Sequence, residues 1–419
     1  MISRLPLLGA IADDVTGATD LCSTLQREGM RTVQTFRAVT DLDPGEFDAV
    51  VVALKSRTAP TEEAVRDSLA ALGWLQQLGV QQIFFKICST FDSTPAGNIG
   101  PVSDALLDAL GADITVVCPA YPANLRTLYQ GHLFVGNRLL SESSVARHPL
   151  TPMTDPDIVR VLGRQTARGV GLVPHAVVTA GADAIAQAIG NLRAEGAAYA
   201  VVDALTDNDL RAIGTASADL PLVIGGSGVA LGLPENFQRA GRLSAHPATA
   251  AEPARGPAVV LAGSCSSATQ EQVQRMAERL PALKLPVDGT ADLDAAAHQV
   301  AAHLARGPVL LYTTAPPEEV AEVQARVGAE VAQREAESLL AELARRAVAA
   351  GATRIVVAGG ETAGAVLSAL GIQALATGDE IAPGVPWMRS LGDPPLALAL
   401  KSGNFGGPDF FLDALEDAR

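Results

Sequence analysis

Short, unbroken apolar runs alternate with longer stretches of helical periodicity in the first half of the chain. One predicted helix ends near Gly29, and a second carries Val65, Leu69, Leu72 and Leu75 on one face. The apolar runs cover residues 7–12, 50–54, 83–85, 114–118 and 198–202. Short apolar strands that alternate with helices are typical of parallel sheets covered on both faces. The pattern therefore predicts an α/β domain with a largely parallel sheet.

A second α/β unit is predicted after a segment that lacks either period. That segment, residues 245–257, contains Pro247, Pro253 and Gly256 and is typical of a linker. Beyond it, strands are predicted at 259–262, 309–312, 354–358 and 396–400, and a long amphipathic helix at 330–350. A chain of 419 residues is also too long for one ordinary core. We therefore expect two domains, residues 1–244 and 258–419.

Charge and cysteine usage exclude several classes of function. The formal net charge of −15 gives no general attraction to nucleic acid or to anionic lipid. The four cysteines are far apart without a CxxC pair, which argues against a disulfide framework or structural zinc and favours a reducing cytoplasm. No apolar run approaches the roughly 18 to 20 residues of a membrane-spanning helix. Any anionic substrate must therefore be bound by a local positive site.

Charged residues follow the first two predicted strands, at the edge where parallel sheets bind ligands. Asp13 and Asp14 follow the first strand and precede a helix that Thr16 could cap. One aspartate could accept a hydroxyl proton in phosphoryl transfer, although one capping and one solvated aspartate would also explain the pair. Arg57 follows the next strand beside Lys55. Its planar fork suits a carboxylate, and a surface ion pair is the alternative.

A hydroxyl-rich segment, residues 86–94, follows the third predicted strand. Its polar residues suit a polyol or phosphate, and a structural loop of side-chain turns is the alternative. The candidates in it are Lys86, Ser89, Asp92 and Ser93. Cys88, in the same segment, is interpreted as a small packed side chain.

Two further strand ends in the first half carry candidate anion-binding groups. Arg126 follows the strand at 114–118 and could neutralise an acid group. Gly226 and Ser227 follow an apolar run at 222–224 and could offer backbone N–H groups to an anion, or form a plain tight turn.

Three strand ends in the second half are rich in glycine or small hydroxyl residues: 263–266, 359–362 and 402–407. Such loops let the phosphates of a nucleotide approach the backbone, and three tight turns are the alternative. The chain has no GxxxxGK[ST] motif, which disfavours a Walker-type NTPase. No GxGxxG follows the first strand of either domain, which disfavours a nicotinamide dehydrogenase.

Ordered motifs run through both halves of the chain. They are IADDVTGATD at 11–20, LKSR at 54–57, FDST at 91–94, GNIGPV at 97–102, HPLTPM at 148–153, GGSG at 225–228, GSCS at 263–266, GGET at 359–362, IAPGVPW at 381–387 and ALKSGNFG at 399–406. Together they resemble the four-carbon acid sugar kinase family, and most closely its 3-oxo-tetronate 4-kinases. Val15 stands where many members have Phe, and we expect only a packing change there.

The resemblance implies a sugar-acid-binding N-terminal domain and an ATP-binding C-terminal domain. The implied ATP contacts are Ser264, Gly359, Gly360, Glu361, Thr362, Gly403 and Gly406. The expected reaction is transfer of the γ-phosphoryl group of ATP to the terminal hydroxyl of a 3-oxo-tetronate, with Mg²⁺ balancing the phosphate charge. D-threonate or D-erythronate is the alternative acceptor, and a sugar-acid sensor without catalysis is the alternative from another class.

In this mechanism, the N-terminal residues divide into three roles. Asp13 or Asp14 would orient or deprotonate the acceptor hydroxyl. Arg57, with Lys86 or Arg126, would hold the substrate carboxylate. Ser89, Asp92 and Ser93 would bind its hydroxyls. Closure of the domains across the linker would exclude water. The sequence names no metal ligands and no oligomeric state.

Overall fold

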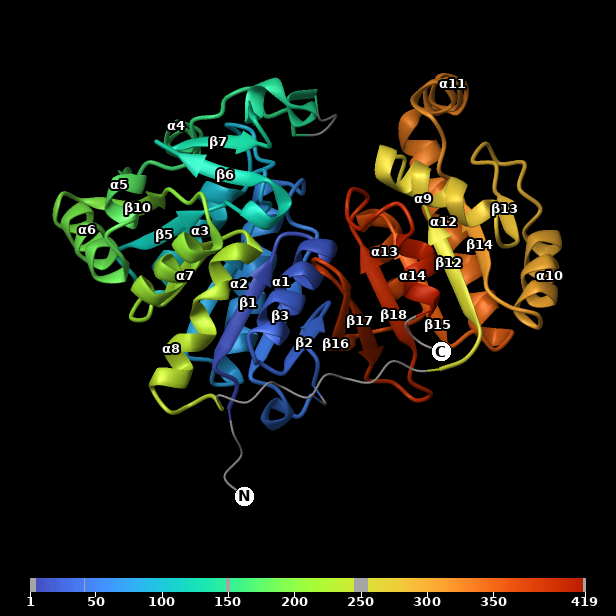
Figure 1. The fold of residues 1–419 in the computed structure, drawn as a ribbon, viewed down its shortest axis with the longest axis horizontal. Coiled ribbons are helices and arrows are strands. Elements are labelled where there is room, and N and C mark those ends of the chain that lie inside the picture. The colour runs from blue at the N-terminus through green and yellow to red at the C-terminus, as the bar shows by residue number, and fades with distance from the viewer. Residues whose placement is uncertain (1–4, 41, 148–150, 245–254, 417–419) are drawn as a thin grey trace. The chain divides into compact units, whose positions relative to one another are not determined.

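The computed structural model describes residues 5–40, 42–147, 151–244 and 255–416. The chain divides into two compact units, residues 1–249 and 250–419, and each is an α/β structure (Figure 1). Most of the expected linker, residues 245–254, lies outside the described residues, as do residues 148–150 of the HPLTPM segment. Each unit is described by itself below.

The first unit is built on parallel strands. They are β1 (Leu8–Ala12), β2 (Thr32–Thr35), β3 (Ala49–Ala53), β4 (Gln82–Lys86), β5 (Thr115–Cys118), β9 (Gly169–Val173), β10 (Ala197–Val202) and β11 (Leu222–Gly225). Their order is β2-β3-β1-β4-β11-β5-β10-β9, and every pairing among them is parallel. β1, β3 and β4 are buried along their whole length, as expected of strands covered on both faces. The prediction of an apolar parallel sheet is confirmed.

The register of the central strands determines which loops meet. Ala12, at the end of β1, pairs with Ala53 of β3 and with Lys86 of β4. The chain therefore leaves these three neighbouring strands at the same edge of the sheet. Asp13, Asp14 and Arg57 follow these strands, and the strand order therefore brings them to the same edge of the sheet.

Helices connect the strands of the first unit. They are α1 (Val15–Arg27), α2 (Thr61–Gln77), α3 (Ile99–Leu110), α4 (Ile158–Gly163), α5 (His175–Val178), α6 (Ala182–Ala194), α7 (Asp207–Ala216) and α8 (Leu233–Arg239), with 3₁₀ turns η1 (Pro44–Glu46), η2 (Pro122–Asn124), η3 (Leu140–Glu142), η4 (Ser144–Arg147) and η5 (Ser227–Leu231). α1 packs on β2 and β3, and α2 packs on β1. The helix predicted to end near Gly29 is α1, and Gly29 follows it with a positive φ of 96°.

The expected cap of α1 was wrong. Asp14, not Thr16, is the N-cap: its backbone is extended, and its Oδ1 accepts a hydrogen bond from the N–H of Gly17 at 3.1 Å. Thr16 is already inside the helix, and its hydroxyl donates to Oδ2 of Asp14 at 2.8 Å. The helix start therefore holds the Asp14 carboxylate in place with two donors.

A small antiparallel sheet, which the sequence pattern did not predict, follows β5. It consists of β6 (Arg126–Tyr129), β7 (His132–Val135) and β8 (Arg138–Leu139) in that order. Gln130 and Gly131 form the turn between the first two strands with φ values of 51° and 72°. Positive φ at both central residues is the geometry of a tight hairpin turn.

The sheet of the second unit combines parallel strands with an antiparallel hairpin. Its strands are β12 (Ala258–Ala262), β13 (Ala282–Lys284), β14 (Val309–Tyr312), β15 (Arg354–Ala358), β16 (Ala374–Ala382), β17 (Val385–Ser390) and β18 (Ala397–Lys401). The order is β13-β14-β12-β15-β18-β17-β16, and β17 runs antiparallel to both neighbours. The four predicted strands of this unit, now β12, β14, β15 and β18, are confirmed.

Along the chain, the helices of the second unit lie between its strands and after the last one. They are α9 (Ser267–Ala277), α10 (Leu293–Leu304), α11 (Pro317–Val327), α12 (Ala329–Ala349), α13 (Gly360–Ala369) and α14 (Phe410–Glu416). The long helix predicted at 330–350 is α12, and Gly351 follows it with a positive φ of 102°. Apolar side chains of β12, β15, β17 and α14 share one buried core that includes Val260, Val356, Trp387 and Phe411.

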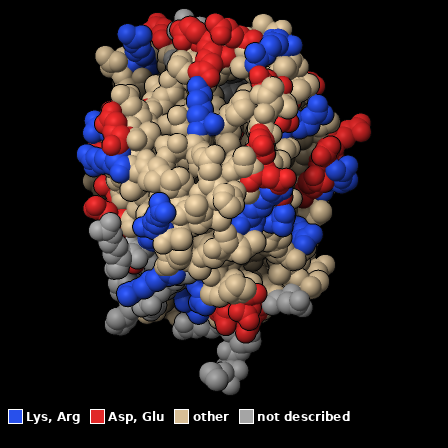
Figure 2. All heavy atoms as spheres, turned by 90° about the vertical axis from the view of Figure 1, so that its right-hand side faces the viewer, with Lys and Arg blue, Asp and Glu red and all other residues tan. Residues whose placement is uncertain are grey.

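One face of the structure is mixed in charge. The face turned to the viewer in Figure 2 carries lysine and arginine interspersed with aspartate and glutamate around uncharged areas. A mixture of signs gives that face no single strong field. In the part of the chain that the structure describes, no helix is long and apolar enough to cross a membrane.

Candidate functional site

Two adjacent carboxylates and one guanidinium form the centre of the site in the first unit. Arg57 binds Asp13 with both prongs: Nε donates to Oδ2 at 2.9 Å and Nη2 to Oδ1 at 2.8 Å. The same Nη2 donates to Oδ1 of Asp14 at 2.6 Å. The Asp13 side chain is 4% exposed, whereas that of Asp14 is 27% exposed. Of the two carboxylates, Asp14 is therefore the one that solvent, or a substrate, can reach.

The pKa values of the two carboxylates are shifted in opposite directions because their surroundings differ. Burial raises the pKa of Asp13 above its usual value, and the charge of Arg57 offsets only part of that rise. Burial also acts on Asp14, but Arg57, Lys86 and the hydrogen bonds from Thr16 and Gly17 outweigh it and lower its pKa. Asp14 is thus held ionised at neutral pH.

The hydroxyl-rich segment lies against this centre. Thr90 donates to Oδ1 of Asp92 at 2.8 Å, and Oδ2 of Asp92 lies 3.6 Å from Nη1 of Arg57. Phe91 and Asp92 have positive φ values of 64° and 37°, which non-glycine residues rarely adopt. Backbone strain of this kind collects at binding sites. Ser89 is half-buried in the same loop.

Lys86 is buried at the end of β4, and its Nζ donates to the carbonyl oxygen of Ile87 at 2.8 Å. Its charge favours the ionised form of both aspartates: it adds to the lowering of the pKa of Asp14 and opposes the rise that burial causes in the pKa of Asp13. Burial raises the pKa of Cys88 to about 12, with the charge of Asp92 a further cause. The thiol is therefore neutral at physiological pH, in agreement with its interpretation as a packed side chain.

Two amide side chains that the sequence reasoning missed hold the loops of this site. Asn98 donates to the carbonyl oxygens of Ser56 at 2.7 Å and of Ala59 at 2.8 Å. Gln165 donates to Oγ of Ser93 at 2.8 Å. Asn98 lay in the quoted GNIGPV motif, but nothing in the sequence marked Gln165. A cavity of about 10 Å³ remains between these loops, enough for about one water molecule, and Asp13, Arg57, Asp92, Ser93 and Asn98 help to line it.

Among the described residues, Gly226, Ser227 and Arg126 form no hydrogen bond or ion pair with Asp13, Asp14 or Arg57. Ser227 is fully buried and its hydroxyl donates to Asp20, while the N–H of Gly226 donates to the carbonyl oxygen of Cys118 at 3.0 Å. Arg126 begins β6 and donates through Nη1 to the carbonyl oxygen of Asn124. Its Nε is buried without a hydrogen-bond partner among the described residues.

In the second unit, the ends of β12, β15 and β18 interlock. A Cβ atom on Gly403 would collide with the hydroxyl of Ser264, and one on Gly263 would collide with that of Thr362. A Cβ on Gly359 would lie 3.1 Å from Oγ1 of Thr362, and its φ of 122° also favours glycine. The structure thus brings together the three loops predicted at 263–266, 359–362 and 402–407.

The remaining nucleotide candidates lie on the same three loops. Gly360 is half-buried and Glu361 is exposed in the first turn of α13, where backbone N–H groups suit an anion. Gly406 has a φ of 78°, and a Cβ there would lie 2.7 Å from the Phe410 ring. Thr314, which was not predicted, donates to the carbonyl oxygen of Ser264 at 2.9 Å. These contacts form a rigid, small-residue surface that phosphates could approach.

Lys401, at the end of β18, is the residue of this region that the sequence reasoning most clearly missed. It is fully buried, and its Nζ donates to the carbonyl oxygens of Ser402 and Gly403 at 3.0 Å each and to Oγ1 of Thr269 at 3.1 Å. Burial lowers its pKa to about 7. A lysine that ends an otherwise apolar strand was the available signal.

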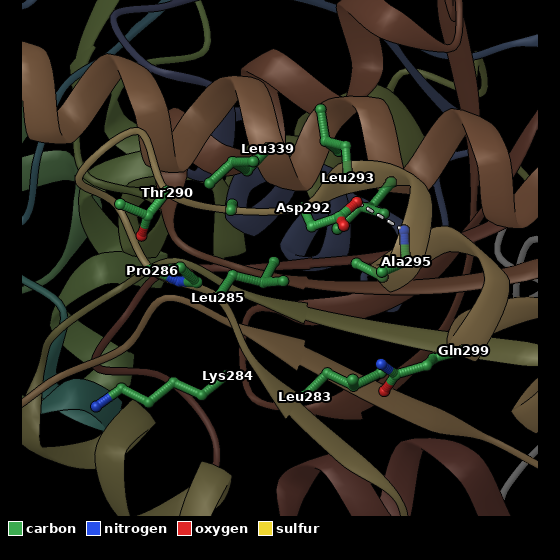
Figure 3. A pocket seen from close by; sticks show the side chains of 13 residues that line it. Leu283, Lys284, Leu285, Pro286, Thr290, Asp292, Leu293, Ala295, Gln299 and Leu339 are labelled. Atoms are coloured by element: carbon green, nitrogen blue, oxygen red, sulfur yellow. Dashed lines mark hydrogen bonds between the residues drawn. The ribbon is translucent and has the colours of Figure 1, made fainter.

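Two cavities lie near the ends of β13 and β14. One, of about 200 Å³, is lined mostly by apolar side chains of β13, α10 and α12 (Figure 3). Its charged groups are engaged, since Lys284 pairs with Glu319 at 2.5 Å and Asp292 caps α10. The other, of about 570 Å³, lies between α9 and β14 and includes Thr314 in its lining. Only the larger cavity therefore adjoins the loop of Ser264.

Each half of the chain matches the model of a known domain family. Residues 8–233 match the model of a sugar-binding N-terminal domain, and residues 259–411 match that of a nucleotide-binding C-terminal domain. Two curated relatives are named 3-oxo-tetronate kinase. The one from Cupriavidus necator is 56% identical and covers 99% of this chain and 98% of its own, and the one from Pseudomonas fluorescens is 54% identical and covers 98% and 96%.

Solved structures share this fold over nearly the whole chain. A Salmonella typhimurium LT2 structure is 43% identical with a TM-score of 0.88, covering 98% of this chain and 99% of its own. A Haemophilus influenzae protein is 42% identical with a TM-score of 0.79, covering 97% and 98%. The chain therefore belongs to the family of kinases that join a sugar-binding N-terminal domain to a nucleotide-binding C-terminal domain, among the relatives named 3-oxo-tetronate kinase.

Proposed function

We propose that this protein transfers the γ-phosphoryl group of ATP to the C4 hydroxyl of a 3-oxo-tetronate. The observation that carries the proposal is the 56% identity, over 99% of the chain, to a relative named 3-oxo-tetronate kinase. The two sites, one in each unit, support it, because the first offers an ionised carboxylate for a hydroxyl group and the second offers small-residue loops for phosphates.

We assign the proton-accepting role to Asp14. It is the more exposed carboxylate of the pair, and two helix-start donors hold its orientation. Asp13 is buried under the bidentate grip of Arg57 and serves to position that guanidinium. Arg57 in turn keeps Asp14 ionised, which is the state that can accept a proton.

The substrate carboxylate requires a cation whose charge and N–H donors are not already taken up by groups of the protein. Arg57 already faces Asp13, Asp14 and Asp92, so its charge is largely matched within the protein. Arg126 keeps a buried Nε without a partner among the described residues. We therefore propose that Arg126 binds the carboxylate, with Lys86 and Arg57 adding positive potential, and that Ser89, Asp92 and Ser93 bind the hydroxyl groups.

The nucleotide is assigned to the loops of the second unit, with its phosphates against Ser264, Gly359 to Thr362, Gly403 and Gly406. Mg²⁺ is expected to accompany it. Among the described residues, no group of three or more His, Cys, Asp or Glu could hold a metal. This fits Mg²⁺, which usually binds through phosphates, water and one or two carboxylates. The ion would balance charge on the phosphates.

The setting proposed for this reaction is the reducing cytoplasm. All four cysteines are free, and two of them, Cys22 and Cys118, are buried. Neither proposed ligand is a macromolecule: both are small anions, and the local cations named above suffice to hold them.

The test is ATP consumption with Mg²⁺ against a panel of acceptors. The panel contains 3-oxo-tetronates, made in place by a dehydrogenase, and D-threonate, D-erythronate and their L-forms. Turnover with the oxo acids alone is the expected result. Turnover with only a reduced acid would keep the kinase and change its substrate, whereas no turnover with any acceptor would overturn the proposal.

A further inference from the structure

We infer that Lys401 is a positioning residue of the nucleotide site. Its ammonium group holds the 402–407 loop through backbone carbonyl oxygens and provides positive charge close to the bound phosphates. The inference rests on the proposed function, because it assumes a nucleotide at these loops. It extends that function to a side chain which no phosphate would need to touch.

The contacts of Lys401 tie three parts of the site together. Its Nζ donates to the carbonyl oxygens of Ser402 and Gly403 and to the hydroxyl of Thr269 on α9. Thr269 and Ser266 also donate to the carbonyl oxygen of Gly403, at 2.8 and 2.6 Å. That single carbonyl therefore accepts from three side chains. The position of the Gly403 backbone, and hence its contact with Ser264, depends on this cluster.

The ammonium group has no anionic partner among the described residues. On α9, Arg275 pairs with Glu271 and with Asp409, each at 3.2 Å, so these three charges engage one another. The charged groups of the other neighbouring elements are exposed: Asp413 and Glu416 of α14, Glu361 of α13 and Arg389 of β17. Arg354 lies at the opposite end of β15 and donates to the carbonyl oxygens of Gly256 and Leu415. Burial is the one cause that shifts the pKa of Lys401, so none of these groups offsets it.

A buried cation without a counter-ion is expensive, and it loses its proton more easily than an exposed one. Lys86, the corresponding buried lysine of the first unit, has Asp13 and Asp14 close enough to affect their titration. Lys401 has neutral oxygens instead. An anion placed on the 402–407 loop would supply the missing negative charge, and would therefore favour the protonated amine.

Proton uptake on nucleotide binding tests this inference. Calorimetric titration of the whole protein with ADP and Mg²⁺ at pH 8, in two buffers of different ionisation enthalpy, gives the protons bound per nucleotide. We expect close to one proton at pH 8 and a fall toward zero at pH 6, where Lys401 already carries its proton. No uptake at pH 8 would overturn the inference, and this test needs no variant.

Two variants separate charge from hydrogen bonding. Lys401→Met should abolish the uptake and raise the KM for ATP about ten- to a hundredfold, the range for loss of a charge-assisted bond, with the KM for the sugar acid unchanged. Thr269→Val, which removes the hydroxyl but keeps the charge, should retain the uptake. Uptake that persists in Lys401→Met would assign the proton to another group and overturn the inference.

The matched control is Arg326→Met, which removes an exposed cation of the same unit that pairs with Asp288 at 2.6 Å. Its uptake and KM for ATP should equal those of the wild type, and a KM raised as far as in Lys401→Met would overturn the specific role of Lys401. The inference fails separately from the proposed function: wild-type protein that binds no ADP contradicts the kinase, whereas ADP binding without proton uptake contradicts only the role of Lys401.

Discussion

Asp13 and Asp14 are neighbours in sequence but differ in almost every physical respect. Asp13 is closed off from solvent and carries a raised pKa, while Asp14 is partly exposed and carries a lowered one. Arg57 contacts both, so the two carboxylates share one cation. A position that only caps a helix does not need this arrangement, because an uncharged asparagine caps equally well.

The first prediction uses that equivalence. Asp14→Asn should keep the helix cap, and hence the melting temperature within a few degrees, but should lower kcat about a hundredfold or more because the proton acceptor is lost. Steady-state kinetics beside a thermal melt will measure both quantities.

Asp67→Asn is the control for that experiment, since Asp67 is exposed and, in the part of the chain that the structure describes, pairs with its neighbour Arg66 alone. Its kcat should match the wild type. Unchanged turnover in both Asp13→Asn and Asp14→Asn would remove these carboxylates from the mechanism.

The cysteines give a second prediction. Cys22 and Cys118 are buried, burial raises the pKa of both Cys88 and Cys118 to about 12, and only Cys265 is exposed. A thiol reagent should therefore label one cysteine quickly in the native protein at pH 8 and four after denaturation. Since Cys265 lies in the 263–266 loop, ADP should slow its labelling.

Mass spectrometry of the labelled protein identifies the site. Fast labelling at Cys88 would mean that the loop of residues 86–94 opens in solution. Equal labelling rates with and without ADP would place the nucleotide away from the 263–266 loop.

At the level of single residues, the sequence predicted best where chemistry follows a strand directly. Asp13, Asp14, Arg57 and Asp92 are brought together because β1, β3 and β4 are neighbours. Gln165 could not be found in this way, because it follows α4 and reaches Ser93 only through the tertiary fold. Lys401 was passed over because the strand end was placed one residue too early.

At the level of elements, the nucleotide loops depend on three glycines that leave no room for a side chain. Gly263, Gly359 and Gly403 each face a hydroxyl of Ser264 or Thr362. Close approach of this kind restricts a position to glycine, because an added methyl group must displace its neighbour.

Gly403→Ala supplies the third prediction. The added Cβ would collide with the Ser264 hydroxyl and push the 402–407 loop away from α9, so the KM for ATP should rise about tenfold or more. The matched control is Gly407→Ala, where the new Cβ meets nothing within 4 Å. If the two variants show the same KM, the packing of Gly403 does not govern nucleotide binding.

The predicted elements succeeded where burial is complete. Strands such as β14 and β15 were placed at their observed bounds because parallel strands read as continuous apolar runs. The β16–β17 hairpin was missed because Pro386 and Gly384 interrupt its pattern, and its strands mix buried with half-buried positions. Antiparallel strands interrupted in this way carry a weaker signal.

At the level of the whole molecule, each unit has its own core and its own proposed ligand. The fourth prediction is that the two ligands stabilise different parts of the protein. In hydrogen exchange, ADP should protect amides of 258–416, and a non-phosphorylated sugar acid should protect amides of 5–244. Protection of 5–244 by ADP in place of 258–416, or of 258–416 by the sugar acid in place of 5–244, would contradict this assignment.

The interlocked glycines and hydroxyls have a consequence for protein engineering. Residues 263, 264, 359, 362 and 403 pack so closely that none of them can be enlarged without displacing another. A library that randomises one of them should therefore return mainly the parental residue. Paired libraries, for example at 264 and 403, would allow a smaller partner to make room for a larger one. Acceptor specificity can be varied on separate loops in the first unit, so that a change of sugar acid need not disturb the phosphoryl donor.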